Sequence, residues 1–445
     1  MVMSTCFALF FIDLLSAVEY IMRITTKVSR FMNRRKLILG RYDYAGFAAY
    51  IMYSVASLTI PLLIVAIGRD LKFPIDDGGM SAGGVLHIIR STAMIITLLL
   101  CGWISSFAGK RISLGISIIL IGGGIFCCAV APAYWFLIPC LLIAGMGEGV
   151  SEGLLTPFVQ DVHPDAPERY VNIAHSFWSV GIFVAVFAAG GLITLGVNWR
   201  IILGTVGIAT ILVSLLFLWK ENPAKPYPES SQAMDLKKLC SDSLAIIKTP
   251  GFWRCSLAMF FGAGAEFGLT FWSAAYIEIN FHTGTWVAAL GTGMIALGMF
   301  VGRTIFGYFA KPSFLRWLLL LASLGTIPVT LLLAFLQPGM LPAVWLFILL
   351  FFLLFLAGIG ISPYWPTTQV YGVQKMPHLD TTLLYVYFSA MGIPGCGFFT
   401  WLMGNIGDKF GLQGAIMVVP CSLAIFALVI FIECWLIPRM QKKVN

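Results

Sequence analysis

The longest polar stretch of the chain is KENPAKPYPESSQAMDLKKLCSDSLAIIKTPGFWR, residues 220–254. Its proline-rich beginning is typical of a linker, and residues 234–248 suit a short amphipathic helix on a membrane surface. Six long apolar segments come before this stretch and six come after it. The stretch therefore predicts a chain of two halves, each with six helices.

The composition places this chain in a lipid bilayer. Of its 445 residues, 59% are hydrophobic and only 11% charged, and the mean hydropathy is +0.91. A soluble protein of this length carries far more charge. About 20 apolar residues in a helix cross the hydrocarbon layer, and abundant internal glycine favours helices over barrel strands. We expect an all-α integral membrane protein with twelve transmembrane helices, at residues 44–67, 83–105, 112–131, 135–160, 173–195, 200–219, 252–276, 286–309, 314–335, 341–370, 381–403 and 413–436.

The predicted domains follow from these segments. The first 31 residues fit poorly, because Asp13 and Glu19 interrupt the apolar run 6–22, so it suits neither a signal peptide nor a spanning helix. We favour a true start at Met32; an amphipathic surface helix is the alternative. The expected order is an N-terminal segment 1–41, a six-helix bundle 42–219, a linker 220–251, a second six-helix bundle 252–437 and a tail 438–445.

Basic residues predict the orientation. If both termini lie on one side, that side collects most Lys and Arg residues, and the other side has only Arg69, Lys72, Arg200 and Lys409. By the positive-inside bias, both termini are cytoplasmic, and we expect the plasma (inner) membrane. The net charge of +8 then reflects topology, not a nucleic-acid partner.

Enzyme motifs are absent from the sequence. It has no phosphate-binding Gly-Lys-Ser/Thr loop, no His-Glu-x-x-His and no plausible Ser-His-Asp set, and its ten cysteines lack metal-ligand spacing. We therefore expect no catalytic residues, no metal and no cofactor.

A faint internal repeat relates the two halves. AGMG at 144–147 and AGIG at 357–360 are 213 positions apart, and the same offset relates Pro164 to Pro377 and Ser176 to Ser389. A constant offset favours a duplicated six-helix unit. Two parallel repeats with a site at their interface describe the major facilitator architecture, and we expect a monomer.

Several motifs carry a resemblance to one superfamily. GKR at 109–111 resembles the end of the loop between helices two and three of major facilitator proteins, although Ser106 stands where that loop has an aspartate. Six further motifs resemble this superfamily, and the last five of them its fucose and glucose/galactose permease branch: GRTIFG (302–307), SEGLLTPF (151–158), NIAHSFWSVG (172–181), AGAEFGLTFW (263–272), GIGISPYWPT (358–367) and GNIGDKFGLQGAIMVVP (404–420). The resemblance implies a proton-linked sugar symporter.

Two glutamates in AGMGEGVSEGLL (144–155) are the candidate proton-coupling residues. In the permease branch, an acid on helix four shortly before Asn-Pro-Phe is tied to proton coupling, and Glu152 precedes TPF here. Burial disfavours the charged carboxylate, so a proton binds there and leaves when the site rehydrates. Glu148 lies one turn earlier on the same face, and two such acids titrate as a coupled pair. A structural ion pair is the alternative, and for Glu148 both interpretations stay open.

The sequence also departs from the branch. Its helix-one aspartate is missing from YSVASLTIPLL (53–63), and His175 and Trp178 stand where helix five of the branch has Gln and Asn. These departures put both the same coupling mechanism and the same sugar in doubt.

Charged residues on helices two and eight form a further set. His87 and Arg90 are three apart, and an intramembrane arginine either neutralises an acid or binds an anionic ligand. We favour an internal pair of Arg90 with Glu148 or Glu266, which leaves a pocket for a neutral sugar. His87 is expected to be a tolerated polar residue, and Arg303 to make a structural or gating contact.

Helices five, seven and ten carry further candidates for substrate binding, in addition to Arg90 on helix two. Flat apolar faces and a few oriented hydrogen-bonding groups suit a carbohydrate, although Trp and Tyr are also common packing residues. The candidates are Arg90, His175, Trp178, Glu266, Trp272, Tyr276, Tyr364, Trp365 and Gln369. The predicted function is proton-coupled transport of a sugar-like solute; the alternatives are a sugar-acid or organic-anion carrier, a drug exporter, or a sensor without transport activity.

Overall fold

A computed structural model describes residues 39–165, 167–220, 223, 226–228, 236–309 and 314–436. The interpretations of the first 31 residues and of the tail 438–445 lie outside these residues. Every regular element in the described ranges is a helix.

The helices follow the predicted order closely. The part before the linker contains α2 (Arg41–Asp70), α3 (Met80–Ala129), α4 (Tyr134–Val162), α5 (Pro167–Ala185), the π-helix η1 (Val186–Gly190), α6 (Gly191–Thr194) and α7 (Trp199–Leu218). The linker contains α8 (Leu236–Lys248). After it come α9 (Pro250–Asn280), α10 (Thr285–Phe309), α11 (Leu315–Phe335), α12 (Ala343–Ile361), α13 (Tyr364–Lys375), α14 (Thr381–Ile416), α15 (Val418–Phe431) and the π-helix η2 (Ile432–Leu436).

The predicted number of transmembrane helices is accounted for. Nine helices in the described part of the chain are long and apolar enough to cross a membrane. One of them, α3, is 50 residues long and contains two predicted spans, separated where Gly109 adopts φ 79° and ψ 161°. Glycine reaches this backbone region without a steric penalty. The helix α9 and the shorter apolar helix Val418–Cys434 supply the remaining two spans.

One predicted helix is interrupted. We predicted a single helix over residues 341–370, but α12 ends at Ile361 and α13 begins at Tyr364. Pro363 lies in the gap; it has no backbone N–H and its ring clashes with the preceding turn. The predicted span itself is confirmed as one span, Ala343–Lys375, in which α13 follows α12 across this short interruption.

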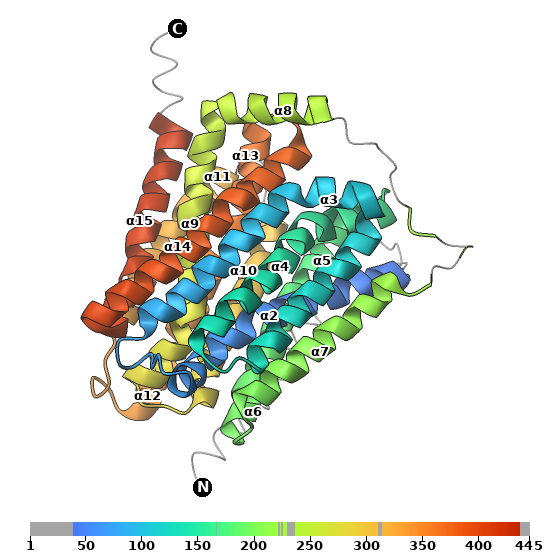
Figure 1. Ribbon diagram of the computed structural model, residues 1–445. Coiled ribbons are helices and arrows are strands. Elements are labelled where there is room, and N and C mark those ends of the chain that lie inside the picture. The colour runs from blue at the N-terminus through green and yellow to red at the C-terminus, as the bar shows by residue number, and fades with distance from the viewer. Residues whose placement is uncertain are drawn as a thin grey trace. The chain divides into compact units, whose positions relative to one another are not determined.

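The linker contacts the helices on both sides of it. The helix α8 lies across one end of the bundle (Figure 1), where the Tyr387 hydroxyl donates to Ser243 Oγ at 2.6 Å. Tyr227 stacks on Phe158 of α4, with 4.6 Å between ring centroids. Residues 41–445 form one unit by their contacts, and the predicted bundle boundaries at 219 and 252 stay predictions.

At the opposite end, where α3 begins, the first half of the chain is joined to the second. The backbone N–H groups of Met80 and Ser81 both donate to the Asp408 carboxylate of α14, each at 2.8 Å. The helices α3 and α14 run side by side from there (Figure 1). A Cβ on Gly84 would lie 2.7 Å from Trp401 Cα, so glycine is needed for this close approach. We call this contact of Asp408 with the start of α3 the Asp408 cap.

Candidate functional site

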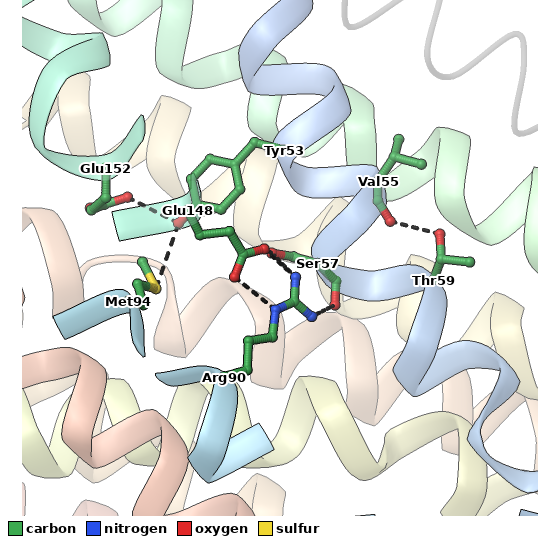
Figure 2. Close-up of polar contacts among 8 residues, drawn as sticks. All are labelled: Tyr53, Val55, Ser57, Thr59, Arg90, Met94, Glu148 and Glu152. Atoms are coloured by element: carbon green, nitrogen blue, oxygen red, sulfur yellow. Dashed lines mark hydrogen bonds and ion pairs between the residues drawn. The ribbon is translucent and has the colours of Figure 1, made fainter. Parts of the chain in front are cut away.

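Arg90 and Glu148 form an ion pair among α2, α3 and α4. Arg90 Nε donates to Glu148 Oε2 at 2.7 Å, and Arg90 Nη2 donates to Glu148 Oε1. The guanidinium also donates to the carbonyl oxygen and to Oγ of Ser57, each at 3.1 Å, and Ser57 Oγ donates to Glu148 Oε1 at 2.9 Å (Figure 2). The side chains are only 5% and 3% exposed. The expected internal pairing of Arg90 is confirmed, with Glu148 as its partner, and the two charges cancel.

Glycines on α4 make this pair possible. A Cβ on Gly145 would lie 2.3 Å from the Arg90 carbonyl oxygen, and one on Gly149 would lie 2.1 Å from the Met94 carbonyl oxygen. Small residues four apart let two membrane helices approach closely. The backbones of α3 and α4 therefore lie near enough for the Glu148 side chain to meet the guanidinium.

A substitution at Gly149 tests this packing. Gly149→Ala places a methyl group against the α3 backbone, and we expect a loss of roughly 1–3 kcal/mol from overpacking, seen as a lower melting temperature of the purified protein. Gly123→Ala is the matched control, because nothing lies within 4 Å of a Cβ there. Equal melting temperatures for the two variants would contradict the close α3–α4 contact.

Glu152 has a different environment. Its Oε2 accepts a hydrogen bond of 3.4 Å from the Tyr53 hydroxyl (Figure 2), and the side chain is half-buried. The Tyr53 ring packs edge-on against Trp178, with centroids 4.7 Å apart. Among the described residues, no ion pair includes Glu152. Of the two glutamates of α4, Glu148 is thus paired with a cation, while Glu152 has only a hydroxyl partner among the described residues.

His175 of α5 belongs to a second polar layer. This layer also contains Thr156, which lies one turn beyond Glu152 on α4. His175 Nε2 is 3.0 Å from Thr156 Oγ1 and 3.2 Å from the Tyr50 hydroxyl, which are themselves 3.1 Å apart. The His175 side chain is exposed. This layer offers donors and acceptors beside the aromatic ring of Tyr50.

Glu266 and Arg303 form another ion pair, between α9 and α10. Arg303 Nη2 lies 3.2 Å from Glu266 Oε1, and the side chains are 30% and 12% exposed. The helix α10, which carries Arg303, contacts α5, which carries His175, across the two halves. The Cys396 thiol of α14 donates to the Ala263 carbonyl oxygen of α9 at 3.6 Å. The two clusters therefore face a common region between the halves.

Comparison with known proteins supports the architecture. A sequence profile of the Major Facilitator Superfamily matches residues 45–396. The chain belongs to this superfamily.

The relatives of this major facilitator protein are distant. Sugar transporter ERD6-like 15 of Arabidopsis thaliana is 30% identical over 190 residues, which are 42% of this chain and 36% of that protein. The match therefore spans only about a third of the relative's length.

Solved structures share the fold. The D-xylose-proton symporter superposes with a TM-score of 0.70 at 13% identity, covering 88% of this chain and 97% of that one. An inward-facing bacterial homologue of the human lysosomal transporter Spinster has a TM-score of 0.67 at 18% identity (88% and 96%). The E. coli fucose:proton symporter has 0.60 at 17% identity (88% and 98%). At these identities the likeness shows the fold alone.

The superfamily loop after helix two keeps a basic residue that has an acidic partner. Lys110 Nζ lies 2.6 Å from Asp161 Oδ2, which also accepts from the Tyr227 hydroxyl of the linker at 2.7 Å. Ser106, which replaces the expected aspartate, donates to the Trp103 carbonyl oxygen instead. The acidic residue that pairs with the basic loop residue in this chain is therefore Asp161, at the end of α4.

The aromatic candidates are mostly enclosed by helix packing in this major facilitator fold. Trp272 Nε1 donates to the Thr400 carbonyl oxygen at 3.0 Å, and the Tyr276 hydroxyl donates to the Leu333 carbonyl oxygen at 2.6 Å. Tyr364 packs on Phe426, with centroids 4.7 Å apart. Contact of these three rings with a substrate stays a prediction.

The other candidates lie on α3 and α13. Gln369 Nε2 donates to Ser389 Oγ at 3.0 Å, and Trp365 is partly buried against a cluster that includes Leu98. His87 is buried and stacks on Phe267, with centroids 4.7 Å apart. His87 therefore packs between the halves, as a tolerated polar residue would.

Sequence reasoning missed the contribution of α2. Tyr50, Tyr53 and Ser57 supply the hydroxyls that contact His175, Glu152 and the Arg90–Glu148 pair. Their spacing of three and four residues places them on one face of a helix, and this spacing is the signal that identifies them.

Proposed function

We propose that this protein is a secondary transporter of the plasma (inner) membrane that moves a neutral sugar together with protons by alternating access. Its termini are cytoplasmic and it works as a monomer. The proposal rests on the contrast between two glutamates of α4: Glu148 forms an ion pair with Arg90, whereas the partner of Glu152 among the described residues is a hydroxyl alone.

Glu152 is the proton carrier in this proposal. Arg90 donates two hydrogen bonds to the Glu148 carboxylate, so that both of its oxygens are engaged by a cation. Glu152 has no such cation, and the cost of burying its charge is relieved by a proton. A carboxylate that is protonated when enclosed and ionised when hydrated couples proton movement to alternating access.

A neutral sugar is favoured by the charge balance. An anionic substrate needs a cation that is free to meet it, but the donors of Arg90 are directed at Glu148 and Ser57. Hydroxyl and imidazole groups of Tyr50, Thr156 and His175 suit sugar hydroxyls instead. The relatives named above as sugar transporters support the same substrate class.

A binding screen tests the substrate class. Purified protein is heated with L-fucose, D-xylose, D-glucose, D-glucuronate, D-galacturonate or uridine, and only ligands that bind the folded state raise its melting temperature. We expect stabilisation by at least one neutral sugar, followed by its uptake into proteoliposomes under a pH gradient. Stabilisation by the two sugar acids alone contradicts the neutral substrate, and uptake that ignores the pH gradient contradicts proton coupling.

The proposed orientation has its own test. On a background without native cysteines, single cysteines at residues 74–80 or 279–284 are expected to react with an impermeant maleimide added to intact cells. Cysteines in 220–250 are expected to react only after the cells are opened. External labelling of 220–250 would overturn the orientation.

A further inference from the structure

The ion pairs Arg90–Glu148 and Glu266–Arg303 differ in how completely they are hydrogen-bonded. Arg90 and Glu148 share two hydrogen bonds, and Ser57 forms a further hydrogen bond with each of the two side chains. Arg303 and Glu266 share one contact of 3.2 Å. Arg303 Nε and Glu266 Oε2 are both buried and have no hydrogen-bond partner among the residues that the structure describes.

Orphaned polar atoms of this kind need an explanation. Buried polar atoms in native proteins almost always have a partner, and the cost of leaving one without a partner is greatest where water is excluded. Here one side of an ion pair leaves an unused N–H donor and the other leaves an unused acceptor. A partner that can accept and donate at once would satisfy both atoms.

The position of the pair is suited to a ligand. Glu266 lies in the middle of α9, and the Arg303 side chain is 30% exposed, so part of it is accessible while its Nε atom is buried. The helix α10 of Arg303 contacts α5, which carries His175, and Cys396 of α14 donates to the carbonyl oxygen of Ala263, one turn before Glu266. The incompletely hydrogen-bonded pair of Glu266 and Arg303 therefore faces the region between the halves. Glu152, the proposed proton carrier, lies in the same region.

The chemistry of the two atoms selects the ligand group. A hydroxyl both donates and accepts, so it can donate to Glu266 Oε2 and accept from Arg303 Nε–H. A carboxylate or phosphate cannot donate and meets the negative charge of Glu266. An ammonium group cannot accept and meets the positive charge of Arg303. A neutral group that both donates and accepts matches the two members of the pair, and in a sugar that group is a hydroxyl.

We propose that the Glu266–Arg303 pair is a subsite for one hydroxyl of a neutral sugar, which makes Arg303 a substrate-binding residue and not only the structural or gating contact expected from its sequence motif. This inference rests on the proposed sugar transport. It assigns the recognition of a single hydroxyl to Glu266 and Arg303. Arg90 and Glu148 recognise no hydroxyl in this proposal.

The subsite is tested by combining a substitution in the protein with removal of one hydroxyl from the ligand. Binding of L-fucose, D-xylose and D-glucose is measured for the wild type together with the monodeoxy analogues of each sugar that binds. Arg303→Lys keeps the positive charge but has no N–H at the position of Nε. We expect the wild type to bind one monodeoxy analogue roughly tenfold or more weakly than its parent, as for loss of a hydrogen bond to a charged group. Arg303→Lys should bind the parent weakly and no longer distinguish it from that analogue.

Control variants keep the test decisive. Glu266→Gln removes the acceptor, is expected to lose discrimination at the same hydroxyl, and replaces Arg303→Lys if that variant is unstable. Arg90→Lys is expected to lower the melting temperature but to preserve the discrimination. If the variants of Arg303 and Glu266 discriminate as the wild type does, the subsite is wrong while sugar transport stands. If the wild type binds none of the three sugars, the proposed function fails and the subsite fails with it.

Discussion

Glu152→Gln is expected to abolish uphill accumulation of substrate while substrate binding survives. An amide mimics the protonated acid but cannot release a proton, so the variant can carry substrate down its gradient only. A pH difference of one unit corresponds to about 1.4 kcal/mol, which sustains about tenfold accumulation if one proton moves with each substrate. In Glu152→Gln this ratio should fall to one.

Assays with proteoliposomes loaded with substrate distinguish uphill accumulation from counterflow exchange. Uptake against a gradient should disappear in Glu152→Gln, whereas counterflow exchange, which needs no net proton movement, should persist. The protein must also keep the melting temperature of the wild type, because Glu152 is held by one long hydrogen bond. Accumulation that continued at the wild-type level would assign proton coupling to another residue.

Arg90→Gln is expected to destabilise the protein strongly. The change removes the cation from Glu148, whose side chain is 3% exposed, and leaves a buried carboxylate without compensation. Breaking a buried pair by removing one partner costs roughly 3–5 kcal/mol. Thermal unfolding in detergent should show a correspondingly large fall in melting temperature.

The double variant Arg90→Gln, Glu148→Gln distinguishes a structural pair from a ligand site. Two amides can hydrogen-bond to each other and carry no charge, so part of the lost stability should return. If Arg90 served an anionic ligand instead, the single variant would keep its melting temperature and lose the binding of D-glucuronate. That outcome would contradict the neutral pocket.

The sequence predicts the spans of this fold well, because each needs about 20 apolar residues and polar loops interrupt the pattern. It predicts the break at Pro363 less well, because the apolar run continues through GIGIS and hides the end of α12. A proline inside a membrane helix is often tolerated, as Pro61 is within α2, so its presence alone does not identify a break.

The candidate site was harder to predict from the sequence. Arg90 had two possible acidic partners, and the choice depends on the α3–α4 crossing that Gly145 and Gly149 permit. The motif AGAEFGLTFW singled out both Glu266 and Trp272, yet Trp272 is fully enclosed. A membrane helix is apolar on every side, so hydropathy does not tell which face meets another helix and which meets a substrate.

The Asp408 cap has a consequence for the resting state of the carrier. Its two hydrogen bonds to the start of α3 join the two halves, and they must be exchanged for water whenever this end opens. Hydrogen bonds to a charged group contribute about 1.5–3 kcal/mol each, so even one of them shifts the population toward the closed form by roughly tenfold or more. The Asp408 cap therefore adds a free-energy cost to the opening of this end, which any solute that enters here depends on.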